Sequence, residues 1–164
     1  MLLVCRTALY DRTKRESEHS RYVDTTELPF LTIDTRKAFR STRVRLGDLA
    51  TVVHPRTGRY CHGIVGDSRE VRGLETSLFL SQTLDLRAGE PAIFLIHPES
   101  GLGQGTIPSL DQIGRRGERL LHQPAAPDGP SWGLVLADYF ADVLQADIRP
   151  ADCPGATGSH SASA

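Results

Sequence analysis

Short runs of apolar and β-branched residues, separated by polar segments, predict a chain built largely of β-strands. The predicted strands lie at residues 28–33, 44–46, 49–53, 60–65 and 91–96, and the last of these is expected to be buried. Residues 54–59 join two of the strands and contain Pro55 and Gly58, which are typical of turns. Residues 49–65 are therefore predicted to form a β-hairpin.

Two helices with a core-facing side are predicted among these strands. Leucines at helical spacing predict the first helix over residues 74–84. Ser109 and Gln112 have the spacing of a capping box, so they predict the start of a second helix, with its apolar residues on one side. Gly114 and Gly117 lie within this second helix and weaken it, because glycine has a low helix propensity.

The pattern divides the chain into one domain and a tail. Residues 1–122 carry the strands and helices, and residues 123–150 form a linker followed by a last predicted helix over 134–145. Residues 151–164 are rich in glycine, serine and alanine, which predicts disorder. Short strands with few helices favour a mainly β fold of the α+β class, a compact single-domain β-barrel with peripheral helices.

The composition excludes several functional classes. The formal net charge is −1, so the chain has no overall basic field of the kind that attracts nucleic acid. The three cysteines and six histidines show no metal-binding spacing, so we expect neither a metal nor another cofactor. Each histidine is interpreted as solvated or as satisfied by neighbours, and Cys61, within a predicted strand, as a small core residue.

The sequence gives no sign of a membrane partner. No segment is long enough to cross a bilayer. The apolar residues 1–4 are too few for a secretory signal, because Arg6 follows them. Either the protein is made without a signal or its true start lies upstream.

Two carboxylates flank the segment that follows the hairpin. Asp67 comes directly after the apolar run 63–65, and Glu75 stands where the helix over 74–84 is predicted to begin. An acid at a strand end and an acid at a helix start can face the same cleft, and paired carboxylates in a cleft are the chemistry of glycoside cleavage. The alternative is that Asp67 is a turn residue and that Glu75 only complements the helix dipole.

Several short motifs resemble, in order and spacing, the recurring pattern of the glycoside hydrolase family 75 chitosanases. They are Arg21-Tyr22-Val23-Asp24, Leu28-Pro29-Phe30, Leu46-Gly47-Asp48, Gly66-Asp67, Glu75-Thr76-Ser77 and the strand 93–96 with its glycine-containing turn. The resemblance covers about residues 5–122. The turn after Asp67 departs from the family's Asp-x-Gly-Pro, because here it reads Asp67-Ser68-Arg69-Glu70.

This resemblance implies a fold similar to the double-psi β-barrel, with Asp67 and Glu75 as the essential acids. It implies cleavage of the β-1,4 bonds of chitosan with inversion, a polysaccharide partner, no cofactor and a secreted protein, which we expect to be a monomer. One carboxyl group then donates a proton while the other activates water. A place in the first turn of a helix suits Glu75 as the base, and the apolar run before Asp67 suits it as the acid.

A cleft for a polycation should be locally acidic, so further acids are candidate substrate contacts. The candidates are Asp34, Asp48 and Glu70, with Tyr60 and Trp132 as candidate aromatic platforms. For each acid the alternative is a solvated surface charge, and for each aromatic residue it is a structural role.

Two other functions remain open. The changed turn after Asp67 could reshape the subsites for another cell-wall glycan, such as peptidoglycan. It could also mark a module that has lost activity and only binds glycans or partners.

Overall fold

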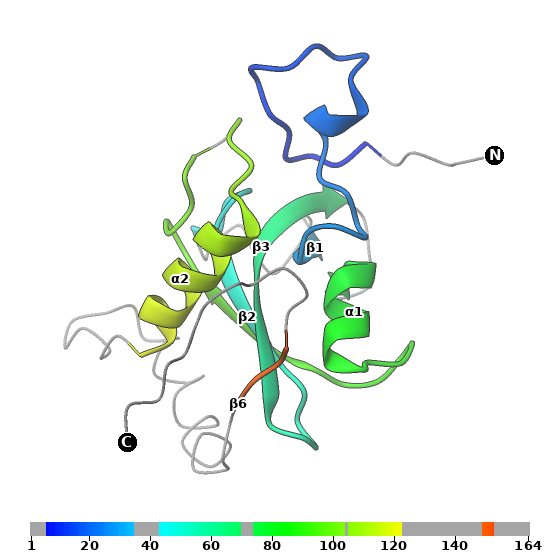
Figure 1. The fold of residues 1–164 in the computed structure, drawn as a ribbon, viewed down its shortest axis with the longest axis vertical. Coiled ribbons are helices and arrows are strands. Elements are labelled where there is room, and N and C mark those ends of the chain that lie inside the picture. The colour runs from blue at the N-terminus through cyan, green and yellow to red at the C-terminus, as the bar shows by residue number, and fades with distance from the viewer. Residues whose placement is uncertain (1–5, 35–42, 70–73, 104, 123–148, 153–164) are drawn as a thin grey trace.

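Consecutive residues of a strand point to opposite faces, and both faces of the central strands are buried, so each face needs a covering layer. The computed structural model describes residues 6–34, 43–69, 74–103, 105–122 and 149–152, which fold as a mixed α+β protein around one open sheet (Figure 1). The strands are β1 (Phe30–Asp34), β2 (Leu49–Val53), β3 (Arg59–Arg69), β4 (Glu75–Thr76), β5 (Ile93–His97) and β6 (Arg149–Pro150). The helices are α1 (Leu78–Leu84), α2 (Leu110–Leu121) and the short 3-10 helix η1 (His19–Arg21).

β3 is the central strand of this sheet. The strand order is β4-β1-β3-β2-β5, and β6 pairs with the beginning of β3. β2 and β3 pair in antiparallel register from Leu49 opposite Ile64 to Val53 opposite Tyr60, which confirms the predicted hairpin. β1 and β6 run parallel to β3 along its other edge.

β3 is longer than the sequence predicted. The apolar run ends at Val65, yet the strand continues to Arg69. It continues because β1 pairs with residues Ile64 to Arg69 and gives these polar residues a hydrogen-bonded neighbour. Asp67 therefore lies within a strand, and the interpretation of residues 67–69 as a turn is wrong.

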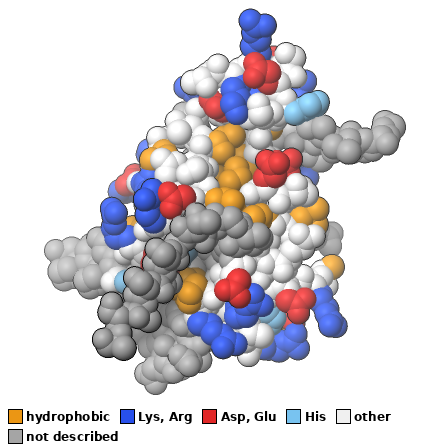
Figure 2. Space-filling view, viewed as in Figure 1, with side chains coloured by type: hydrophobic (Ala, Val, Ile, Leu, Met, Phe, Trp, Pro, Cys, Tyr) orange, Lys and Arg blue, Asp and Glu red, His pale blue; other side chains and the backbone are white. Residues whose placement is uncertain are grey.

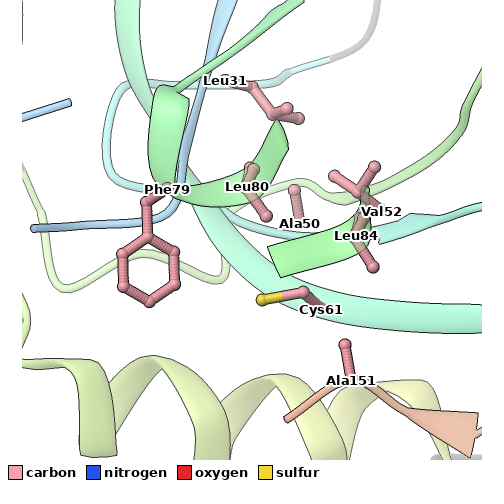
Figure 3. Packing of buried hydrophobic residues seen from close by; sticks show 8 residues of the cluster. All are labelled: Leu31, Ala50, Val52, Cys61, Phe79, Leu80, Leu84 and Ala151. Atoms are coloured by element: carbon pink, nitrogen blue, oxygen red, sulfur yellow. The ribbon is translucent and has the colours of Figure 1, made fainter. Parts of the chain in front are cut away.

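The face that carries Ala50 and Val52 is covered by α1. Figure 3 shows Leu80 and Leu84 of this helix beside those two β2 residues. Cys61 belongs to the same cluster and is 2% exposed, which confirms its predicted place in the core. Ala50, Val52, Leu80 and Leu84 are fully buried. Burial of each of the larger side chains among them contributes about 1–3 kcal/mol of hydrophobic stabilisation.

The opposite face is covered by α2. Ile113 of this helix packs with Leu49 and Ile64, which alternate with the α1-facing residues along their strands. The Ser109 hydroxyl accepts a hydrogen bond from the Gln112 amide, and the Gln112 side chain accepts one from the Ser109 amide. The predicted capping box is thus confirmed, and the sheet lies between two helices.

Three local predictions differ from the structure. Residues 44–46 are not a strand, because they lead into a turn at Gly47, whose φ of +92° favours glycine. β5 is half-buried rather than buried, because it is an end strand in the described sheet. The first helix begins at Leu78 instead of residue 74, because Ser77 caps it and its hydroxyl accepts a bond from the Leu80 amide.

Substitution by alanine is expected to have opposite effects on stability at the two glycines of α2. A Cβ at Gly117 would lie 2.4 Å from Cγ of His62, whereas a Cβ at Gly114 would meet nothing within 4 Å. We expect Gly117→Ala to lower the free energy of unfolding by about 1–3 kcal/mol through overpacking. Gly114→Ala should raise it by about 0.5–1 kcal/mol through helix propensity. Urea denaturation of both variants measures the difference, and equal effects would contradict the close contact at Gly117.

The linker 123–133 and the helix predicted over 134–145 lie outside the described residues, as do residues 153–164 of the tail predicted over 151–164. At the start of that tail, Ala151 is 7% exposed and its amide donates to the carbonyl of Tyr60, so the prediction of disorder is wrong there. Within the described ranges, no helix has both the length and the apolar character needed to cross a membrane. Figure 2 shows charged side chains of both signs interspersed over one face, with a narrow band of hydrophobic side chains between them, as the net charge of −1 leads one to expect.

Candidate active site

The strand register places the two predicted acids on either side of Thr32. Thr32 of β1 pairs with Asp67 of β3 on one edge and with Glu75 of β4 on the other. Residues directly opposite one another in a sheet point to the same face. Asp67, Thr32 and Glu75 therefore form a row across three neighbouring strands.

A β-bulge in β3 brings Asp67 into this row. The register between β1 and β3 shifts after Leu31, so that Leu31 pairs with Val65 but Thr32 pairs with Asp67. The extra residue is Gly66, where a Cβ would lie 2.7 Å from Cβ of Phe30. The bulge thus turns Asp67 onto the face of Thr32, and it needs glycine at position 66 because Phe30 lies so close.

Asp67 is held by the backbone of the N-terminal segment. Its Oδ1 accepts hydrogen bonds from the amides of Ala8 and Ser68, both at 2.9 Å. The Leu9 amide also donates to the carbonyl of Gly66 at 3.0 Å. The Asp67 side chain is 15% exposed, so Oδ1 is fixed by these bonds while Oδ2 lies near Arg69.

Arg69 joins the two acids. Its Nη2 lies 2.6 Å from Oε2 of Glu75, and its Nε lies 3.9 Å from Oδ2 of Asp67. The guanidinium is 55% exposed and Glu75 is 48% exposed, so this ion pair faces solvent. A ligand that entered between the carboxylates would have to displace the arginine.

Glu75 does not lie in a helix. It is part of the short strand β4, and α1 begins three residues later. The proposal that the helix dipole favours its anion is therefore wrong, because the field of a helix terminus falls off within the first turn and the cap here is Ser77. The Ser77 hydroxyl also accepts a bond from the Phe30 amide, which fixes the start of α1 against β1.

Asp48 is a buried loop residue. Its side chain accepts hydrogen bonds from the amides of Arg45, Glu99 and Gly101, at 2.7, 3.1 and 3.0 Å, and the residue is 2% exposed. These bonds hold the turn before β2 against the loop after β5. The two loops line a cavity of about 370 Å³. The glycine-containing turn after β5 is thus fixed at its start.

The remaining predicted contacts are described only in part. Asp34 is the last residue of β1 and pairs with Arg69 in the register, but its side chain lies outside the described part. Glu70 and Trp132 also lie outside the described residues. Tyr60 is 4% exposed and its hydroxyl donates to Glu118 of α2, so its position supports the structural interpretation.

A polar cluster under α2 was missed by the sequence analysis. The Tyr60 hydroxyl donates to the Glu118 carboxylate at 3.0 Å, and Nε2 of His62 lies 2.9 Å from the same carboxylate. Burial, together with the nearby Glu118 carboxylate, raises the pKa of Tyr60 above its ordinary value. The partners are more than fifty residues apart in the chain, and no local motif signals their meeting.

No arrangement of three or more histidine, cysteine, aspartate or glutamate side chains in the described part could hold a metal ion. The row of Asp67, Thr32 and Glu75 could instead supply acid and base groups to a substrate. Comparison with protein-family models finds no match to this chain, and comparison with curated proteins finds no relative.

Proposed function

We propose that the protein hydrolyses the β-1,4 bonds of chitosan, with Asp67 and Glu75 as the two reacting carboxylates. The observation that supports this most is the register, because both acids pair with Thr32 and face the same side of the sheet. It is independent of the motif resemblance, since strand pairing does not depend on how the motifs were interpreted. A double-psi arrangement of the strands is part of the same proposal.

The spacing of the acids suits an inverting reaction. They lie two strands apart, which puts their Cα atoms about 10 Å from one another. Inverting glycosidases separate their carboxyl groups by about 6.5–9.5 Å, which leaves room for the attacking water. Retaining enzymes need about 5–5.5 Å, so inversion fits the row better.

The contacts of each acid favour different roles. Both amide bonds to Asp67 end on Oδ1, so a proton on this carboxyl group would sit on Oδ2, the oxygen near Arg69. That position suits the donor to the leaving oxygen. Glu75 is about half exposed, so bulk water reaches it readily, which suits the base.

Arg69 is compatible with a cationic substrate. An exposed ion pair contributes only about 0–1 kcal/mol, so opening it costs little. The ammonium groups of chitosan carry the same charge as the guanidinium and can replace it beside the carboxylates. A neutral glycan offers no such replacement, and the two acids would lose their counter-ion when it bound.

Arg69 also supports a second candidate, a glycan-binding module without activity. The arginine occupies the space between the acids, and it stands where the resembling family has the Gly-Pro of its turn. In this alternative the row binds an amino sugar but transfers no proton.

Release of reducing ends from chitosan, with chitin and peptidoglycan as parallel substrates, distinguishes these functions. We expect hydrolysis of chitosan alone, with products of inverted anomeric configuration by NMR. Cleavage of peptidoglycan alone would point to another cell-wall hydrolase. Binding of chitosan oligomers without any hydrolysis would favour the binding module. The absence of both binding and hydrolysis would reject the proposal.

A further inference from the structure

Helix α2 is fixed to the sheet by a histidine cluster. His62 of β3 lies between Thr51 and Glu118, with Nδ1 2.9 Å from the Thr51 hydroxyl and Nε2 2.9 Å from the Glu118 carboxylate. The helix backbone passes directly over the ring, because a Cβ at Gly117 would lie 2.4 Å from it. His62 is 8% exposed, so its ring is enclosed between the sheet and α2.

His97 of β5 lies on the same face. It pairs with Leu49, two positions before Thr51, and Thr51 pairs with His62. Its Nε2 is buried and has no hydrogen-bond partner among the described residues. A proton added to this nitrogen would place a charge with no described acceptor beside a second histidine.

Among the described residues, polar groups from three elements surround the two histidines. α2 contributes Glu118 and Arg116, and its C-cap residue is His122; Arg116 donates to the carbonyl of Ser100 at 2.6 Å. From β3 comes Tyr60, whose hydroxyl donates to Glu118. β2 contributes the hydroxyl of Thr51. Glu118 is the single carboxylate among these groups.

Two histidines at this interface resist protonation. Burial lowers the pKa of His62, and the nearby Glu118 carboxylate does not fully offset that effect. Burial, with the neighbouring His62, also lowers the pKa of His97. Burial opposes the charge of Glu118, but hydrogen bonds from His62, His122 and Tyr60 outweigh it and lower the pKa of this carboxyl group. The neutral imidazoles and the charged carboxylate therefore belong to the docked helix.

α2 depends on this docking to remain helical. It has two glycines within twelve residues, and each costs about 1 kcal/mol relative to alanine. Isolated helices of this length are marginal in water even when rich in alanine. A residue of higher helix propensity cannot replace Gly117 without a clash, since the His62 ring fills the space of a side chain.

We propose that α2 is released from the sheet by acid, through protonation of His62 and His97. A proton on Nδ1 of His62 turns an acceptor into a donor, so the buried Thr51 hydroxyl must reverse. A proton on Nε2 of His97 adds a second cation on the same face. Undocking removes both unfavourable charges from the interface, because water then solvates the charged rings.

The direction in which pH changes the docking of α2 follows from the lowered pKa values of the two histidines. Above about pH 6.5, the ordinary histidine pKa, both rings are neutral whether α2 is docked or not. As the pH falls below that value, the undocked state takes up protons first, and docking weakens until the pH passes below the lowered pKa values. Release is therefore expected on the acid side of about pH 6.5.

Hydrogen exchange measured by mass spectrometry tests this directly. After correction for intrinsic rates, protection of residues 110–121 should be at least about 10-fold lower at about pH 5 than at about pH 8, since one pKa unit is a factor of ten. Peptides of α1 serve as the internal reference, because that helix packs on the other face of the sheet. Equal changes in α1 and α2 would overturn the proposal.

Variants assign the effect to these histidines. The double variant His62→Gln/His97→Gln keeps neutral side chains and should lose the pH dependence of α2. If it does not fold, His97→Gln alone leaves the His62 bonds in place and should lose part of the dependence. His19→Gln, on the exposed η1, is the control that should retain it. Wild-type pH dependence in the His97 variant and in the double variant would reject the proposal.

Discussion

Replacing Asp67 by asparagine is expected to lower the rate of chitosan hydrolysis at least about 10²-fold, because the variant has no proton to donate to the leaving oxygen. The fold should survive this change. The amide oxygen of asparagine can accept the hydrogen bonds that Oδ1 now accepts from Ala8 and Ser68. Loss of activity without a lower melting temperature would therefore separate the chemistry from stability.

Two further variants complete this experiment. Glu75→Gln should also lose activity, because the amide cannot activate water, and the remaining activity of each single variant should resemble that of the double variant. Asp85→Asn is the matched control, since Asp85 ends α1 in a left-handed conformation that asparagine also adopts. Full activity in Asp67→Asn would remove this residue from the mechanism, whatever the control shows.

Replacing Asp48 by alanine is expected to lower the free energy of unfolding by about 3 kcal/mol. The change leaves three backbone amides, those of Arg45, Glu99 and Gly101, without their acceptor. Each donor left unsatisfied in a buried site costs about 1–3 kcal/mol, and partial access to water puts the total near the lower end of the sum. Urea denaturation gives the value.

Asp48→Asn is the matched variant for this prediction. One amide oxygen can replace only one of the two carboxylate oxygens, so we expect an intermediate loss of stability. A stability of Asp48→Ala within about 0.5 kcal/mol of the wild type would show that the loops do not need these bonds. A raised KM for chitosan with unchanged stability would instead support the predicted role of Asp48 in substrate binding.

Local patterns predicted the elements whose causes are local. The hairpin over 49–65 depends on the Pro55–Gly58 turn and on two apolar runs that face each other, and the structure has it. The start of α2 depends on Ser109 and Gln112 alone, and the structure has the capping box. Such signals need no knowledge of the rest of the chain, so the sequence is enough.

The wrong predictions of secondary structure concern residues whose conformation is set by pairing with a strand that is remote in the chain. Residues 67–69 look like a turn, but β1 pairs with them and keeps them extended. Glu75 looks like a helix start because leucines at helical spacing follow it, yet the register with Thr32 holds it in β4. Ser77 is the local signal for the true start of α1, since serine is a preferred N-cap residue.

The sequence analysis selected two acids but did not predict the strand pairing that relates them. Asp67 and Glu75 were selected from the sequence, and the register puts them on one face. The sequence did not predict that Arg69 would contact both acids, because side-chain direction cannot be deduced from residue order in a misassigned turn. The His62–Glu118 cluster was missed for a related reason, since it joins a strand and a helix that are remote in the chain.

The contact between Ala8 and Asp67 uses a backbone amide, and this has a consequence for how the site can vary over evolution. Every residue except proline offers the same donor, so position 8 is free to drift while the carboxylate keeps its support. The support is therefore encoded by the path of the main chain and leaves no trace in residue identity. Proline at that position would be the one natural replacement able to abolish it.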